Sequence, residues 1–294
     1  MTVAQAATPI QDNLKAAAML AGSSACFTIN DLIIKLLSSS MPVGQMLFVR
    51  GVMITSMLVG AILWAKETLH LRRLAMPLNI VRSLFEVAVT FFFLAGVVRL
   101  PLATATTIMF TAPIFLTLLA FFVLREHVGP WRWAAVVAGF LGVVLIADPS
   151  TGLDPFMLLP LVAAVLTAGR DTLTRMIGAE LPARSIALTT AVAVMMAGLT
   201  TAPLGEWVAL DVALLGGLFV CALLLAVAYV LLVSAVRTGE VSFIAPFRYV
   251  SILLALVFGI TVFGDTPSFS ACLGGAVIVG SGLLIFHRER ARSR

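Results

Sequence analysis

Long apolar runs separated by short polar connections make up almost the whole chain. Ten runs reach or approach the roughly 20 apolar residues that a helix needs to cross about 30 Å of hydrocarbon. These runs cover residues 14–36, 43–64, 77–98, 102–122, 132–147, 155–178, 183–203, 211–235, 242–263 and 268–287. Leu, Ala, Val and Gly fill them without the polar alternation of a membrane barrel strand. The pattern predicts an all-α integral membrane protein with ten transmembrane helices.

The composition agrees with lipid as the main solvent of this chain. Hydrophobic residues make up 61% of it, charged residues only 11%, and the mean hydropathy is +1.11. A soluble domain has about a quarter of its residues charged. The connections between the runs are also too short to hold a separate soluble domain. Cys26, Cys221 and Cys272 fall inside predicted spans, which favours packing over a disulfide framework.

Basic and acidic residues alternate between successive connections. One side carries Lys66, Arg72, Arg73, Arg125, Arg132, Arg184, Arg237 and the arginines of the carboxyl-terminal tail. The other side carries Asp148, Asp154, Glu206, Asp211 and Asp265, with Arg99 as its clear basic residue. The positive-inside rule then predicts a plasma (inner) membrane protein with both termini in the cytoplasm. The net charge of +5 follows from this topology and does not indicate a nucleic-acid partner, because the basic residues are spread over several short loops.

The chain contains an internal repeat. NDLIIKLLSSSMP begins at residue 30 and RDTLTRMIGAELP begins at residue 170, and the two stretches share one frame. The matched pairs are Asp31 with Asp171, Lys35 with Arg175, Met41 with Leu181, and Pro42 with Pro182. Val98-Arg99 likewise recurs as Val236-Arg237, 138 residues further on.

Spans one to five and spans six to ten are therefore predicted to be two copies of one unit, with bounds at 1–148 and 149–294. An odd number of spans in each copy forces the second copy to lie upside down relative to the first. Inverted repeats are a construction principle of secondary transporters, whose substrate site lies near the midplane between the copies. The two units are expected to form one integrated membrane domain.

Two segments resemble the end of a known repeat unit. FTAPIFLTLLAFFVLREHVGPWRWAAVVAGFLGVVLI (110–146) and APFRYVSILLALVFGITVFGDTPSFSACLGGAVIVGSGLLI (245–285) both read as a helix, an acidic turn and a Gly-rich last helix. This pattern resembles the EamA unit of the drug/metabolite transporter superfamily, and with the first-helix motifs it covers nearly the whole chain. The second turn departs mildly from the pattern, because Asp265 stands where Glu is usual.

The resemblance implies a secondary transporter that exports amino acids and related small metabolites, and the aromatic amino acid exporters are the nearest branch. A broad drug or nucleoside exporter of the same fold is the alternative. A membrane-embedded enzyme or a receptor-like scaffold is more distant, because the chain has no HExxH, GxSxG, phosphate-binding Gly loop or CxxC motif. No cofactor is expected. His70, His127 and His287 are isolated, so no metal site is expected either.

Ionisable residues inside predicted spans are candidates for gating or coupling, because each costs upward of roughly 2.5 kcal/mol at a helix centre. Asp31 and Lys35 are one turn apart and can form an ion pair near a helix end, as can Asp171 and Arg175. The alternative is that Asp31 or Asp171 carries a coupling proton. Both interpretations stay open at this point.

A second group of charges has no charged counterpart in the other copy. Its members are Arg50, Arg82, Glu86, Arg170 and Arg248. The orientation puts all of them except Arg50 in the cytoplasmic half. We expect this cytoplasmic cluster to close the inner mouth and to meet a substrate carboxylate, which suits the planar guanidinium fork. The alternative is that these charges only anchor helices at the interface.

Hydroxyl and aromatic side chains near the predicted midplane favour an amphipathic small molecule as substrate. The cavity candidates are Thr90, Phe110, Thr111, Tyr229, Arg248 and Tyr249. The two tyrosines lie inside spans, away from the interfacial belt that Tyr usually occupies. The alternative is ordinary core packing. Pro113 is a candidate bend in the fourth run.

Spans five and ten each contain a small-xxx-small pair. Ala138 and Gly142 form the first pair, and Ala276 and Gly280 form the second, again 138 residues apart. Such pairs let two helices approach closely. They serve packing within the chain or a homodimer, and the sequence leaves both open.

Overall fold

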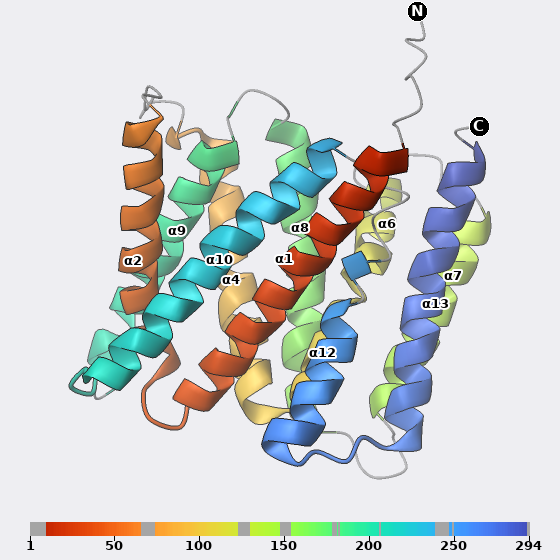
Figure 1. Ribbon diagram of the computed structural model, residues 1–294. Helices are drawn as coiled ribbons and strands as arrows, with labels where there is room; N and C mark the ends of the chain where they lie inside the picture. Colours follow the sequence, from red (N-terminus) through yellow and green to blue (C-terminus); the bar gives the residue numbers. More distant parts are fainter. Residues whose placement is uncertain are drawn as a thin grey trace, which may run out of the picture.

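The computed structural model describes residues 10–65, 74–122, 130–147, 154–177, 181, 183–205, 207–238, 247–248 and 250–292. Every regular element in these residues is a helix, and together they make ten passes along the long axis of the molecule (Figure 1). The predicted all-α fold with ten helical passes is confirmed.

The helices follow the predicted runs closely. Seven passes are α1 (Ile10–Leu37), α2 (Val43–Trp64), α4 (Pro77–Arg99), α7 (Pro130–Ala147), α9 (Ala183–Thr200), α10 (Val212–Thr238) and α13 (Phe269–Arg292). The other three are composite: α5 (Leu102–Met109) with α6 (Ala112–Phe122), η2 (Pro155–Met157) with α8 (Leu158–Ile177), and α12 (Val250–Phe258) with the π-helical turn η5 (Gly259–Phe263). The first and last helices extend beyond their apolar runs because backbone hydrogen bonding continues through polar residues outside the hydrocarbon.

The break in the fourth pass lies where Pro113 was expected to bend it. α5 ends at Met109 and α6 begins at Ala112, with Pro113 in the first turn of α6. Proline lacks the backbone N–H and its ring clashes with the carbonyl four residues earlier, so a helix restarts more readily than it continues. Thr111 caps the break by donating from its hydroxyl to the carbonyl of Ile108 at 2.7 Å.

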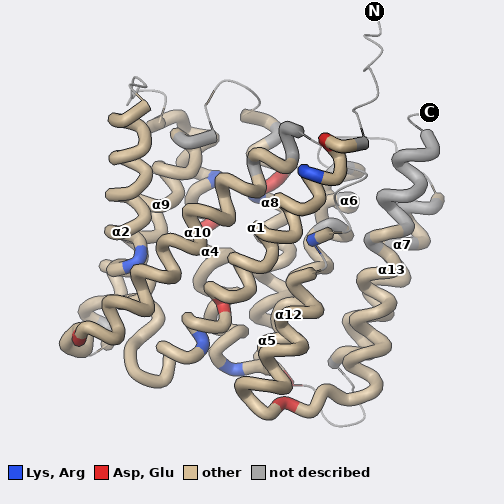
Figure 2. Tube along the Cα trace, in the orientation of Figure 1, with Lys and Arg blue, Asp and Glu red and all other residues tan. Residues whose placement is uncertain are grey.

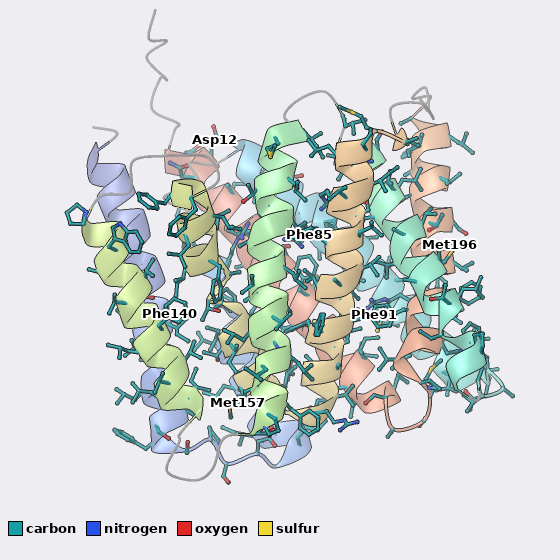
Figure 3. All side chains as sticks on the ribbon, turned by 180° about the vertical axis from the view of Figure 1, so that it is seen from behind. Asp12, Phe85, Phe91, Phe140, Met157 and Met196 are labelled. Carbon is teal, nitrogen blue, oxygen red and sulfur yellow. The ribbon has the colours of Figure 1, made fainter. Side chains whose placement is uncertain are left out.

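The outer surface is apolar and fits a lipid environment. Five helices are long and apolar enough to cross a membrane by themselves, and shorter apolar helices accompany them. Charged positions are sparse along the traced chain, and several lie midway along helices (Figure 2). Large apolar side chains such as Phe140 on α7 and Met196 on α9 point outward (Figure 3). Lipid can cover these faces without any cost in apolar exposure.

The helix pairs reveal the inverted symmetry. α1 packs along α10 and α4 along α8, while α2 pairs with α9 and α7 with α13. Exchanging the two halves converts the α1–α10 pair into the α8–α4 pair and leaves the other two pairs unchanged. In Figure 1, α1 begins at the end of the molecule where α13 ends, and α8 runs in the direction opposite to α1. We call this end the terminal end and the other the opposite end.

Two bundles follow from these contacts. The first bundle contains α1, α2, α10 and α12, and the second contains α8, α9, α4 and the α5–α6 pair. Each bundle mixes helices from both halves, and each is the counterpart of the other when the halves are exchanged. They form two layers, with the second bundle nearer the viewer in Figure 3. The predicted boundary between the halves, at residues 148 and 149, lies outside the described residues.

The last pass of each half joins the other at one edge of the molecule through small residues. A methyl group added to Gly142 of α7 would lie 2.8 Å from the carbonyl oxygen of Gly274 on α13, and the reverse distance is 2.5 Å. The small-residue pair in span five therefore packs helices within the chain. Gly280 of the second pair has open space at the same position and makes no such contact.

Candidate functional site between the two bundles

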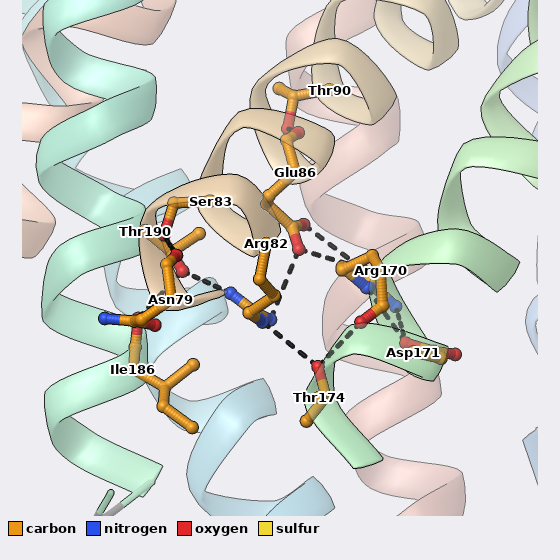
Figure 4. A network of polar contacts seen from close by, with 10 residues as sticks. All are labelled: Asn79, Arg82, Ser83, Glu86, Thr90, Arg170, Asp171, Thr174, Ile186 and Thr190. Carbon is orange, nitrogen blue, oxygen red and sulfur yellow. Dashed lines mark hydrogen bonds and ion pairs between the residues drawn. The ribbon is translucent and has the colours of Figure 1, made fainter. Parts of the chain in front are cut away.

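A charged network surrounds Glu86 on α4 (Figure 4). Arg170 of α8 donates from Nη1 to both carboxylate oxygens of Glu86, at 2.9 and 3.2 Å. Arg82, one turn earlier on α4, places Nη2 3.5 Å from Oε2 of Glu86. The side chain of Glu86 is only 9% exposed. A carboxylate this deep stays ionised only with such partners.

Arg170 also holds a second carboxylate. Its Nε and Nη2 donate to Oδ1 of Asp171 at 2.9 and 2.8 Å. Two guanidinium groups therefore face two carboxylates, and the network is formally neutral. Asp171 was expected to pair with Arg175, whose side chain lies outside the described residues, and its described partner is Arg170.

Two threonines fix Arg82 from the second half of the chain. Its Nε donates to Oγ1 of Thr174 at 3.2 Å, and its Nη1 donates to Oγ1 of Thr190 on α9. Each hydroxyl spends its own proton on a carbonyl in its helix, Thr174 on Arg170 and Thr190 on Ile186, both at 2.8 Å. Their lone pairs are thus left for the guanidinium group. The predicted i,i+4 pair of Arg82 and Glu86 is present and is part of a wider network.

The network joins α4, α8 and α9, which all belong to the second bundle. The charges expected to form a cytoplasmic cluster thus lie together, except Arg248. Arg248 is exposed near the start of α12 in the first bundle. In this conformation the network braces one bundle and does not bridge the two. Its role as a gate stays a prediction.

An equivalent but shorter network lies in the first bundle. Arg50 of α2 donates from Nη1 to Oδ1 of Asn30 on α1 at 3.1 Å, and Nδ2 of Asn30 donates to Oδ1 of Asp31 at 3.0 Å. Asn30 and Arg50 are buried. In the repeat, Asn30 and Asp31 match Arg170 and Asp171, and Arg50 matches Thr190. The two halves therefore place polar contacts at equivalent positions but distribute the charge differently.

The expected ion pair of Asp31 with Lys35 is wrong. Asp31 is held by Asn30, whereas Lys35 donates from Nζ to the backbone carbonyl of Leu100 and lies 4.7 Å from the ring centroid of Phe263. Leu100 caps the carboxyl end of α4, where carbonyl groups lack helical partners and carry partial negative charge. The long lysine side chain reaches this carbonyl more favourably than its own helix neighbour.

Two inward-facing side chains show that the space between the bundles is hollow. Tyr229 stands on the same face of α10 as Leu218, Ala222 and Leu225, which are buried, yet Tyr229 is 40% exposed. It lies deep among protein atoms, so the exposed surface faces an internal space. Its ring meets Phe27 of α1 edge-on, with centroids 5.4 Å apart.

Asp171 repeats this pattern on α8. It shares a face with the buried residues Pro160, Ala164 and Thr167, yet its side chain is 41% exposed. Both Asp171 and Tyr229 lie in the parts of their helices nearer the terminal end, while the buried residues lie nearer the opposite end. The hollow therefore opens toward the terminal end, with the Glu86 network on one wall and Tyr229 on the other.

The remaining predicted cavity residues lie elsewhere or serve structure. Thr90 donates to the carbonyl of Glu86 at 2.8 Å and supports the network from α4. Phe110 packs on the cluster of Ile108, Ile146 and Ile278 beside α7 and α13, and Thr111 is buried at the break in the fourth pass. Tyr249 lies outside the described residues.

Sequence reasoning missed the neutral members of both networks. Asn30, Thr174 and Thr190 were not among the candidates, although Asn30 and Thr190 stand at repeat positions opposite two arginines. An uncharged polar residue that aligns with a charged one in an inverted repeat is the signal that would have found them.

Comparisons with known proteins agree with this architecture. The EamA-like transporter family model matches residues 14–147, which run from α1 to the end of α7. A riboflavin transporter of Rhizobium johnstonii is 33% identical over 208 residues, which cover 68% of this chain and 67% of that protein. The chain belongs to the EamA-like transporter family. The family resemblance read from the sequence is thus confirmed.

Other relatives and one solved structure extend the comparison. An S-adenosylmethionine uptake transporter of Rickettsia prowazekii is 26% identical over 66% of each chain, so the match spans about two thirds of that relative. The pseudopaline exporter CntI of Pseudomonas aeruginosa is 22% identical over 92% of this EamA-like chain and 95% of that protein. A crystal structure superposes with a TM-score of 0.63 over 97% of this chain and 99% of that chain, at 16% identity. That likeness concerns the fold alone.

Proposed function

We propose that this chain is a secondary transporter of the plasma membrane that moves a small metabolite by alternating access between its two bundles. Family membership, the inverted symmetry of the helix pairs and the hollow between the bundles support this function. Both termini lie on the cytoplasmic side in this proposal, so the hollow opens to the cytoplasm. The direction of net transport expected from the sequence, export, remains part of the proposal.

The walls of the hollow favour a substrate with a planar aromatic ring and polar substituents. Tyr229 offers an aromatic face and a hydroxyl on one wall, and the accessible Asp171 with Arg170 offers hydrogen bonding and charge on the other. Riboflavin and S-adenosylmethionine, named for relatives of the chain, both carry fused nitrogen heterocycles and hydroxyl groups. We therefore propose a heteroaromatic metabolite as substrate, with riboflavin as the first compound to test.

Aromatic amino acids are the second candidate. Arg170 and Asp171 present opposite charges side by side, 2.8 Å apart, which matches the carboxylate and ammonium groups of a zwitterion. This arrangement favours an amino acid over a neutral drug. The amino acid class expected from the sequence is retained on this ground.

Counterflow in proteoliposomes tests the proposal. Purified protein is reconstituted with unlabelled riboflavin inside, and uptake of labelled riboflavin is followed, with parallel sets for S-adenosylmethionine and phenylalanine. We expect exchange of one ring-bearing compound above that of protein-free liposomes, and its loss in Tyr229→Ala. Exchange of none of the three would contradict the proposed substrate class. A membrane enzyme or receptor-like scaffold would move no solute at all.

A further inference from the structure

The two bundles meet at the opposite end through an apolar seal. Leu32 of α1 and Ala255 of α12, from the first bundle, pack with Val97 of α4 and Leu102 of α5, from the second. A neighbouring cluster joins Ile34 of α1 to Leu94 of α4. By contrast, the buried cluster nearest the terminal end, around Ala16 and Ala235, packs α1 against α10 within the first bundle.

Lys35 adds a polar contact to this seal. It belongs to α1 of the first bundle, and its ammonium group donates to the carbonyl of Leu100 at the end of α4 in the second. The ring of Phe263, from the first bundle, lies 4.7 Å below the same group, and Asp265 attracts it electrostatically. A charge-assisted hydrogen bond and a cation–π contact thus act across the closed end.

A cavity lies beyond this contact, on the side of the opposite end. Its volume is about 350 Å³, and its lining includes Leu100, Thr104, Gly259 and Asp265. The hollow lined by Tyr229 lies on the other side of the seal. Lys35 therefore stands between the cavity at the opposite end and the hollow that opens toward the terminal end.

The repeat supplies the same parts at the terminal end. Lys35 matches Arg175 near the end of α8, at a spacing of 140, and Leu100 matches Thr238, the last residue of α10, at a spacing of 138. Lys35 and Leu100 lie at the carboxyl ends of two helices from different bundles. Arg175 and Thr238 lie at the equivalent ends of α8 and α10, which again belong to different bundles. Since the second half is inverted, this second pair stands at the end where the hollow is open.

We propose that Lys35 and Arg175 are alternating latches. Lys35 holds the opposite end closed by bonding the carbonyl of Leu100, as the structure has it. When the bundles rock, this contact breaks and Arg175 closes the terminal end on the carbonyl of Thr238. This inference rests on the proposed transport function and assigns each closed state to one basic residue.

The two latches predict opposite effects of removing the charge. Lys35→Met removes the bond that favours the present state, so the opposite end opens more often. Arg175→Met weakens the alternative state, so the terminal end stays open more of the time. A hydrogen bond to a charged group changes a two-state equilibrium on the order of tenfold, and we expect shifts of that size. Lys35→Arg and Arg175→Lys keep the charge and should behave as the parent.

Labelling of one cysteine measures these shifts without any substrate. The reporter is Tyr229→Cys in a chain whose three native cysteines are replaced by alanine, and a membrane-impermeant maleimide is added to vesicles of either orientation. Relative to this parent, Lys35→Met should raise the labelling rate from the opposite end about tenfold. Arg175→Met should lower that rate and raise the rate from the terminal end. Lys15→Met, an exposed lysine at the other end of α1, is the matched control and should change neither rate.

The outcomes separate the latch from the transport proposal. Shifts of both methionine variants in the same direction, or no shift in either with normal labelling of the parent, would overturn the latches. Failure of counterflow with mirror-image labelling shifts would instead leave the latches in place and reject the proposed substrates. Size-exclusion profiles of the two charge-keeping variants identify any variant that does not fold.

Discussion

Glu86 is the residue whose removal should disturb the second bundle most. Its carboxylate accepts from Arg170 at 2.9 Å and lies 3.5 Å from Arg82, with 9% of its side chain exposed. In Glu86→Gln both guanidinium groups lose this partner, although Arg170 keeps Asp171. Removing one partner of a buried ion pair costs about 3–5 kcal/mol, and the remaining carboxylate places the expected loss near the lower limit, about 3 kcal/mol.

Asp171→Asn is the matched comparison. Its pair with Arg170 is as short, 2.8 Å, but its side chain is 41% exposed to the hollow. Water there screens the charge, so the expected loss is at most about 1 kcal/mol. The free energy of unfolding of both variants is measured in the same detergent or bilayer. Equal losses, or a larger loss for Asp171→Asn, would refute the conclusion that Glu86 is the buried centre of the network.

Three further perturbations follow from the described contacts. Gly274→Leu should strongly destabilise the chain in thermal unfolding because the α7 backbone faces this glycine, while Gly280→Leu, with open space at that position, should have little effect. Asn30→Leu should cost about 1–3 kcal/mol of unfolding free energy, because the buried Arg50 loses its acceptor, and Asn30→Gln should recover little of it. In counterflow, Tyr229→Phe should retain exchange with weaker half-saturation, since the ring stays and only the hydroxyl is lost.

The fold was predictable because its determinants are local and periodic. Apolar runs long enough for the bilayer gave ten passes, and Pro113 marked the break in the fourth. The frame shared by Asp31 and Asp171 indicated two copies, and an odd number of spans required the inversion. These arguments need only helix length, the missing N–H of proline and the direction of the chain.

The site was only partly predictable, because its partners come from different halves. Arg82, Glu86, Arg170 and Asp171 were identified as intramembrane charges, but their mutual contacts depend on α4 packing along α8. The i,i+4 rule gave the pair of Arg82 with Glu86. The same rule failed for Lys35, because the free carbonyl of Leu100 lies within reach only once α1 and α4 have packed.

The exposed fraction of Tyr229 could not be deduced from spacing either. Its position on α10 falls on the buried face, and periodicity alone predicts a core residue. Only the separation of the two bundles toward the terminal end makes its ring accessible. Phe110 and Thr111, chosen by the same midplane criterion, pack beside α7 and α13 instead.

Distances between spin labels on α1 and α8 test the central claim most directly, because these helices occupy equivalent places in the two bundles. One label pair at Lys15 and Met176 reports the terminal end, and a second at Leu36 and Leu158 reports the opposite end, all at exposed positions. On adding a transported substrate, the account predicts that the first distance shortens while the second lengthens. Changes of both distances in the same direction, or no change during active counterflow, would contradict alternating access between the two bundles.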